Sequence, residues 1–230
     1  MNKPILQYTD LITVPVQDNG EPLLDVSNLL PDVLCEYQKL DMLSYVGNRF
    51  FLRRGVIERL RLAFIALKKE LPHWRLKLVY AYRHPEIQTK YFETRRNEIR
   101  SRNPDLTEDE VRDRAHLLSA SPDVAGHPTG GAIDITIISG TGAELDMGTG
   151  IADFSQGEKI QTFFPSLSEK QKEYRLLLRE LLMKQEFAPF DGEWWHFSYG
   201  DREWAKYYEK PASFYSTIYN NYPPESPMIN

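Results

Sequence analysis

Cysteine is the residue that this 230-residue sequence uses least, with Cys35 as its only example. A single cysteine cannot form an internal disulfide, and it excludes zinc sites that are built from several thiolates. Cys35 has no histidine close to it in the sequence. We therefore interpret Cys35 as a buried structural thiol rather than a nucleophile.

Long apolar runs and an excess of positive charge are also missing. No segment approaches 18 consecutive apolar residues, which argues against a membrane-spanning helix. The formal net charge of -5 argues against a nucleic-acid-binding protein, which normally presents a basic face. We therefore predict that neither a membrane nor a nucleic acid is a partner. Nothing in the sequence indicates an oligomeric state.

The first ten residues lack the apolar stretch and the small-residue cleavage site of a secretory signal. If this is the natural start, the expected location is the cytoplasm. A mature form whose signal has been removed would begin in the same way, so a periplasmic location stays open.

The chain length and an apolar fraction of 41% suit one soluble globular domain. No repeat and no shift in composition marks a boundary, so we predict a single domain over residues 1–230. Residues 1–35 have scattered proline and glycine and are expected to form an extended arm. The tail, 211–230, is rich in Tyr, Pro, Ser and Asn, and is either a packed surface strap or partly disordered.

Hydrophobic periodicity and capping residues predict four helices and four strands. The helices are expected over 56–71, over 84–100, after Thr107 with a Thr107/Glu110 capping box, and over 166–185 with a Ser166/Glu169 capping box. The strands are expected over 76–82, 132–138, 187–190 and 194–198. Separated helices with hairpin-like strands favour an α+β fold over a parallel α/β sheet.

Two histidines and an aspartate form the most informative pattern. His127 precedes Asp134 by seven residues, an odd offset that would place them on opposite faces of one continuous strand. They can converge if the chain turns between them, and Thr129-Gly130-Gly131 supplies such a turn. An aspartate within an otherwise apolar strand is costly unless it is paired or bound to a metal.

A second segment, Glu193-Trp194-Trp195-His196, completes the pattern. His127, Asp134 and His196 are a suitable ligand set for one zinc ion, with the fourth position left for water. Glu193 would contact that water and act as a proton shuttle. Each half alone is more often an ordinary hydrogen-bonded or surface motif than a metal site. The remaining histidines, at positions 73, 84 and 116, are expected in surface or capping roles.

These segments resemble the zinc D-alanyl-D-alanine dipeptidases of the VanX type. Further similarity lies in Tyr82-Arg83, in Leu145-Asp146-Met147-Gly148-Thr149 and in Asp153-Phe154, and the resemblance covers roughly residues 75–200. It implies that His127, Asp134 and His196 bind zinc and that Glu193 is the general base and acid. It also implies that Arg83 stabilises the oxyanion, and that the fold has a central antiparallel sheet flanked by helices, as in the Hedgehog/DD-peptidase group.

The sequence departs from this family where a serine often precedes the first histidine, because Gly126 stands there. A serine would be expected to help hold the dipeptide, so we predict that Gly126→Ser lowers KM. Arg83 is also followed by His84-Pro85 rather than directly by proline. A dipeptidase also needs an acidic anchor for the substrate amine, and Asp146, Asp153 or Asp191 could serve.

The leading hypothesis is a zinc dipeptidase that cleaves D-Ala-D-Ala or a similar short dipeptide, in peptidoglycan metabolism or a related setting. The nearest alternative is a peptidoglycan D,D- or L,D-carboxypeptidase on the same fold. A different class is a zinc-stabilised binding module without catalysis. Structural zinc sites usually have four protein ligands, and only three are evident here.

Overall fold

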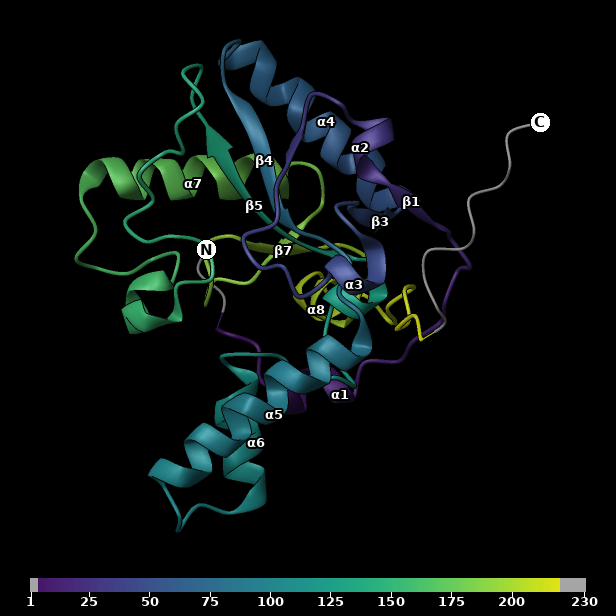
Figure 1. Cartoon of the computed structure of the whole chain (residues 1–230), viewed down its shortest axis with the longest axis vertical. Helices are drawn as coiled ribbons and strands as arrows, with labels where there is room; N and C mark the ends of the chain where they lie inside the picture. The colour runs from purple at the N-terminus through teal and green to yellow at the C-terminus, as the bar shows by residue number, and fades with distance from the viewer. Residues whose placement is uncertain (1–3, 220–230) are drawn as a thin grey trace.

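The computed structural model describes residues 4–219 and confirms the α+β fold (Figure 1). Five strands form the main sheet in the order β2-β4-β5-β7-β6, and β1 pairs with β3 in a separate two-stranded sheet. The strands are β1 (Leu23–Asp25), β2 (Leu34–Cys35), β3 (Phe51–Arg53), β4 (Arg75–Tyr80), β5 (Ala132–Ile138), β6 (Ala188–Pro189) and β7 (His196–Ser198). The main sheet is antiparallel apart from β2, which runs parallel to β4.

Eight α-helices surround these sheets in the described part of the chain. They are α1 (Tyr8–Ile12), α2 (Val26–Leu29), α3 (Leu43–Val46), α4 (Arg54–Glu70), α5 (Pro85–Arg102), α6 (Glu108–His116), α7 (Glu169–Met183) and α8 (Arg202–Tyr207). The described residues also include two 3₁₀ helices, His127–Thr129 and Phe154–Ile160. Within residues 4–219, none of the helices combines the length and the apolar character that crossing a membrane requires.

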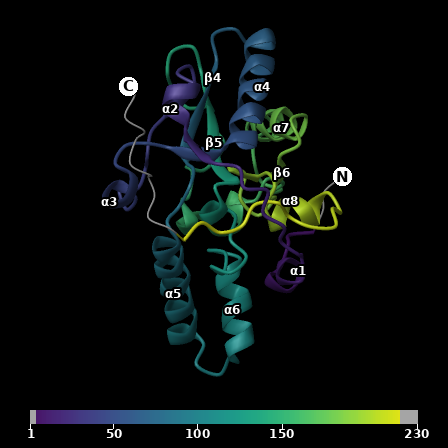
Figure 2. The ribbon, with the colours of Figure 1, turned by 90° about the vertical axis from the view of Figure 1, so that its right-hand side faces the viewer.

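Helices α4 and α7 lie together on one side of the main sheet (Figure 2). Strand β5 turns Ile133, Ile135 and Ile137 into the core that these helices share, because alternate residues of a strand face the same side. Asp134 and Thr136 therefore face the opposite side of the sheet. This is the side on which the polar residues of the site gather.

Helices α5 and α6 extend away from the sheet as an antiparallel pair (Figures 1 and 2). Pro85 occupies the first turn of α5, where its missing N–H costs no hydrogen bond, and the His84 side chain accepts a hydrogen bond from the Glu86 N–H. The capping role predicted for His84 is thereby confirmed. Thr107 and Glu110 form the predicted capping box of α6.

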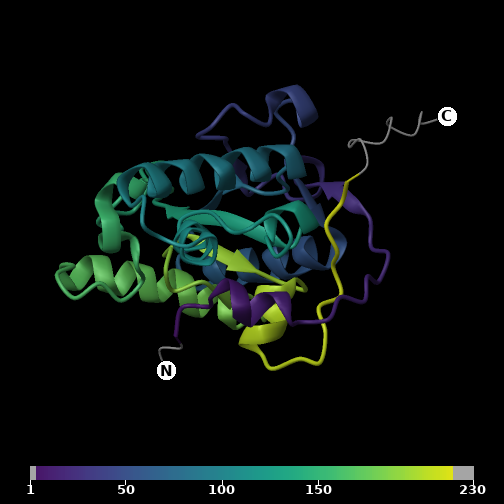
Figure 3. The same cartoon turned by 90° about the horizontal axis from the view of Figure 1, so that it is seen from below.

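Helix α1, near the start of the described chain, contacts α8, near its end. Helix α1 packs beside α8 (Figure 3), and Arg202 donates hydrogen bonds to the carbonyls of Leu11 and Ile12. This contact holds α8 in place, and α8 carries Glu203, a residue of the site described below.

Two details of the secondary structure differ from the sequence prediction. Helix α7 begins at Glu169 with Ser168 as its N-cap and Gln171 as the third helical residue, so the predicted Ser166/Glu169 capping box is wrong. Residues 8–35 are not a plain extended arm, because they form α1, β1, α2 and β2. Strand β2 forms hydrogen bonds along the edge of β4. The sequence did not predict this pairing, because residues 1–35 show no regular hydrophobic period.

The described part of the tail is packed rather than loose. Ser213 pairs with Val16 in a β-bridge, and Tyr215 is buried with its hydroxyl donating to Glu21. The strap interpretation therefore holds for 211–219, and residues 220–230 lie outside the described residues.

Cys35 is half-buried rather than fully buried. Its burial raises the pKa of the thiol to about 11, which agrees with a structural role.

Candidate active site

Asp134 and His196 are brought together by strand pairing. Asp134 on β5 lies directly opposite His196 on β7, so their side chains leave the same face of the sheet. The Oδ1 atom of Asp134 is 3.1 Å from Nδ1 of His196. The register of this antiparallel pair therefore supplies two of the three predicted ligands.

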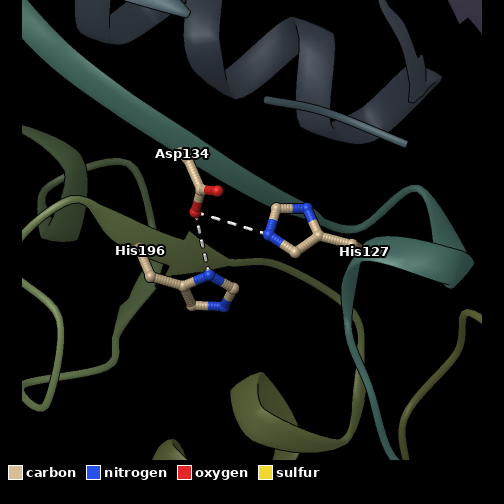
Figure 4. Close-up of side chains that lie close together, drawn as sticks. All are labelled: His127, Asp134 and His196. Carbon is tan, nitrogen blue, oxygen red and sulfur yellow. Dashed lines mark hydrogen bonds and ion pairs between the residues drawn. The ribbon is translucent and has the colours of Figure 1, made fainter. Parts of the chain in front are cut away.

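His127 reaches the same point from the 3₁₀ helix before β5. Gly130 adopts a φ of +73° at the end of this helix, a left-handed conformation that favours glycine, and the chain turns there into β5. The turn predicted from Thr129-Gly130-Gly131 is confirmed. Nε2 of His127 is then 3.3 Å from Oδ1 of Asp134 (Figure 4).

The ring orientation of both histidines is fixed by a second hydrogen bond. Nδ1–H of His127 donates to the Ala81 carbonyl at 2.8 Å, which leaves Nε2 facing Asp134. On the other ring, Nε2–H of His196 donates to the Glu203 carboxylate at 3.2 Å, which leaves Nδ1 facing Asp134. Such outer partners orient histidine ligands in metal sites and make them more basic.

The three donor groups fit a zinc ion. One ligand atom from each of His127, Asp134 and His196 lies within 4.8 Å of the others, and all three residues are buried. Two imidazole nitrogens and one carboxylate oxygen are a common ligand set of catalytic zinc sites. Their convergence in a buried position, with no cysteine, is the arrangement that a three-ligand zinc site with an open position needs.

The electrostatics of the cluster also favour a bound cation. Burial alone would raise the pKa of Asp134, but His127 and His196 lower it far below its usual range. Burial alone would lower the pKa of His196, but Glu203 and Asp134 raise it well above its ordinary value. The carboxylates therefore stabilise positive charge at this point, and a zinc ion would supply that charge in place of protons.

Glu193 lies beside the cluster without belonging to it. Its backbone carbonyl accepts a hydrogen bond from the His196 N–H, and its side chain lines the same cavity as the three ligands. Desolvation of its carboxyl group raises the pKa of Glu193 to about 7. A carboxyl group that titrates close to neutral pH can both accept and return a proton.

Arg83 approaches the cluster from the segment after β4. Its backbone N–H donates to the His127 carbonyl at 3.2 Å, and its Nη1 donates to Oε1 of Gln88 at 2.8 Å. Gln88 in turn donates to the Ala120 carbonyl at 2.7 Å. Gln88 thus holds the guanidinium at Nη1, while the buried Nε of Arg83 has no hydrogen-bond partner among the described residues.

These residues line a cavity of about 310 Å³. Its walls come from the start of α5, from the loop after α6 and from the 3₁₀ helix that begins at Phe154. His116 also lines this cavity and is buried, so the surface position considered for it is wrong. Its Nδ1 accepts a hydrogen bond from the Ser121 N–H. His73, by contrast, is exposed as expected.

None of the three aspartates considered as an amine anchor lines the cavity. Asp191 forms a buried two-point ion pair with Arg179, at 2.8 and 2.9 Å. Asp146 accepts hydrogen bonds from Gly148 and Gln171, and Asp153 caps the 3₁₀ helix that follows it. The contacts of these three aspartates are structural.

Gly126 lies where close packing excludes a side chain. A Cβ atom there would stand 2.1 Å from Oδ2 of Asp201 and 3.0 Å from Cβ of Ala132. A serine could therefore not be added without moving its neighbours. The prediction that Gly126→Ser lowers KM stays a prediction, and it requires Asp201 to move away from the new side chain.

Glu203 and Gln88 are site residues that the sequence did not reveal. Glu203 lies on α8, seven residues after His196, and Gln88 lies five residues after Arg83. Neither spacing is a recognised metal-site pattern. The only signal for Gln88 was its place in the first turns of a helix that begins just after Arg83.

The chain is similar to known D-alanyl-D-alanine dipeptidases. The family model described as D-Ala-D-Ala dipeptidase matches residues 39–216. A D-alanyl-D-alanine dipeptidase from Synechocystis sp. is 29% identical over 227 residues, which covers 86% of this chain and 90% of that protein. One from Escherichia coli (strain K12) is 34% identical over 73 residues, or 32% of this chain and 37% of that protein.

Two solved structures show a more distant likeness. VanYB in complex with D-Alanine-D-Alanine has a TM-score of 0.43 and 16% identity, and the match covers 71% of this chain and 81% of that chain. The LdcB LD-carboxypeptidase has a TM-score of 0.45 and 21% identity, and the match covers 85% of this chain and 78% of that chain.

Proposed function

We propose, from the premise that this chain belongs to the D-Ala-D-Ala dipeptidase family of metallopeptidases, that it hydrolyses D-Ala-D-Ala or a similar short dipeptide. The family match and the similarity to a D-alanyl-D-alanine dipeptidase support peptidase activity of this kind. The observation that carries the proposal is the buried His127, Asp134 and His196 cluster, which opens into a cavity lined by Glu193 and Arg83. We assign one zinc ion per chain to this cluster.

A bound zinc ion and Glu193 would contribute different parts of the reaction. When bound, a zinc ion supplies an activated water and a Lewis acid for the peptide carbonyl. Glu193 is the group in the chain that takes the proton from the attacking water and returns it to the leaving amine. Its raised pKa suits both steps, because such transfers are most efficient when the catalytic pKa lies near the working pH.

We assign to Arg83 the stabilisation of the negative charge that develops on the carbonyl oxygen. Its guanidinium is held by Gln88, so it need not reorganise when this charge appears. A fixed donor in a cavity that excludes bulk water stabilises such charge far better than a mobile one. Gln88 is thus a positioning residue for Arg83.

One observation favours the carboxypeptidase alternative. Among the described residues the cavity-lining carboxylates are Asp134, Glu193, Glu203 and Glu98. The first three belong to the metal centre or contact it, and Glu98 forms an ion pair with Arg95 at 2.8 Å. No acid is therefore reserved for a free substrate amine, although a dipeptidase should need one. The cytoplasmic location also stays a prediction.

The test is a comparison of three substrates with zinc-loaded protein. These are D-Ala-D-Ala, its N-acetyl derivative and a pentapeptide that ends in D-Ala-D-Ala. We expect the free dipeptide to be cleaved fastest, because the family acts on dipeptides. Faster cleavage of the acetylated dipeptide or of the pentapeptide would favour the carboxypeptidase, and cleavage of none of the three would reject both activities.

A further inference from the structure

Three cations gather around two aromatic rings on the wall of the cavity. The Nζ atom of Lys39 lies 4.8 Å from the centre of the Tyr91 ring, and the guanidinium carbon of Arg83 lies 5.2 Å from the same centre. Lys39 also lies 5.9 Å from the centre of the Phe154 ring, beside which Arg95 lies at 5.4 Å. All five residues line the cavity.

These cations have too few negative partners. Arg95 pairs with Glu98, and both side chains are partly exposed. Lys39 has no carboxylate within ion-pair distance in the described part of the chain, and Lys90 adds a fourth positive side chain to the lining. Like charges held close together repel one another, so an anion between them would be stabilised.

The surroundings of Lys39 place it near the reacting centre. Desolvation and then the positive charge of Arg83 lower the pKa of Lys39, while the negative charge of Asp134 acts in the opposite direction. Lys39 lines the same cavity as Arg83, the predicted oxyanion donor, and Asp134, a predicted metal ligand. Neighbouring Cα atoms in a peptide are about 3.8 Å apart, so a carboxylate one residue beyond the scissile bond would still lie within the cavity that Lys39 and the cluster share.

We propose that Lys39 is a specificity-determining residue that binds the C-terminal carboxylate of the substrate, with Arg95 beside it and Phe154 against the last side chain. The proposal rests on the proposed function only in part, because a dipeptide and a carboxypeptidase substrate both present this carboxylate. The aromatic rings give Lys39 a weak cation–π contact in the free enzyme, which keeps its ammonium at the cavity without neutralising it.

The experiment compares D-Ala-D-Ala with D-alanyl-D-alaninamide, which lacks the carboxylate charge, in the zinc-loaded wild type and in Lys39→Met. The wild type is expected to favour the acid. Lys39→Met should raise KM for the acid by about 10- to 100-fold, the range for losing a hydrogen bond to a charged group, and leave KM for the amide unchanged. Lys39→Arg should restore most of the preference.

Lys90→Met is the matched control, because Lys90 also lines the cavity but has no ring contact or ion pair in the described structure. If Lys90→Met lost as much of the preference for the acid as Lys39→Met, the preference would come from the overall positive charge of the cavity rather than from a binding site at Lys39. That result would overturn the proposal. So would an equal rise in KM for acid and amide in Lys39→Met, which would indicate a structural role.

The two proposals fail in different ways. If the wild type cleaves both ligands and Lys39→Met keeps the wild-type preference, the assignment of Lys39 is wrong while the enzyme activity stands. If the wild type neither cleaves nor binds D-Ala-D-Ala or the pentapeptide that ends in it, measured by calorimetry with zinc-loaded protein, both the proposed function and the role of Lys39 are rejected.

Discussion

Glu203 on α8 accepts a hydrogen bond from Nε2–H of His196 at 3.2 Å, on the side of the ring opposite to Asp134. Burial would raise the pKa of Glu203, but the neighbouring His196 lowers it below its ordinary value, so the carboxylate is the form present. This pair would orient His196, one of the proposed zinc ligands, through a residue that would not touch the metal. It connects the metal centre to α8 and, through Arg202, to α1.

We predict that Glu203→Gln weakens zinc binding by about 10- to 100-fold, the usual effect of losing an outer partner of a histidine ligand. The amide keeps the size of the side chain but removes its charge. Competition with a chromogenic chelator measures the affinity. Glu186→Gln, in a surface ion pair with Arg59, is the control and should bind zinc like the wild type. Unchanged affinity in Glu203→Gln would limit Glu203 to a packing role.

Glu193→Gln should retain its zinc but lose hydrolysis. General acid–base catalysis contributes typically about 10²- to 10⁴-fold to the rate, and an amide cannot take a proton from water. Metal analysis and the rate of D-alanine release are measured on the same preparation. Loss of the metal would instead make Glu193 a ligand and contradict its assignment as proton shuttle.

Gly126→Ser should destabilise the protein by about 1–3 kcal/mol, because the new Cβ atom would overlap Oδ2 of Asp201. Denaturant unfolding measures this loss. Gly150→Ser is a matched control, since the nearest atom to a Cβ there is Cβ of Asp153 at 3.9 Å. A Gly126→Ser protein as stable as the wild type would show that Asp201 can move away at little cost.

The sequence predicted the long elements and the residues of the His127, Asp134 and His196 cluster because each had a local signal. The alternating isoleucines of 132–138 marked β5, and the paired glycines before it marked the turn that lets His127 and Asp134 converge. The register that sets Asp134 opposite His196 had no such signal. Register depends on which residues of distant strands pair, and the sequence of either strand leaves several choices.

The residues that were missed act through contacts between distant parts of the chain. Glu203 meets His196 only because α8 folds back against β7, and Lys39 reaches the cavity from a loop before α3. The predicted capping box of α7 was wrong for another reason. Ser166/Glu169 and Ser168/Gln171 have the same spacing, so the pattern alone could not select the helix start.

Asp191→Ala should separate a structural aspartate from a substrate anchor. Asp191 and Arg179 are both buried, and removing one partner leaves an uncompensated charge that costs about 3–5 kcal/mol. We expect a lower unfolding free energy with KM unchanged in the folded enzyme. Asp113→Ala, in an exposed pair with Arg112, should lose little stability. A raised KM in Asp191→Ala would return this residue to the substrate site.

The most direct measurement for the central claim is zinc content combined with activity in the wild type and in His127→Ala. We predict one zinc ion per wild-type chain, loss of D-Ala-D-Ala hydrolysis on chelation and its return when zinc is added. His127→Ala should bind zinc much more weakly, because only two of the three clustered ligands remain. Full zinc occupancy in His127→Ala, or full activity of the chelated wild type, would contradict the account.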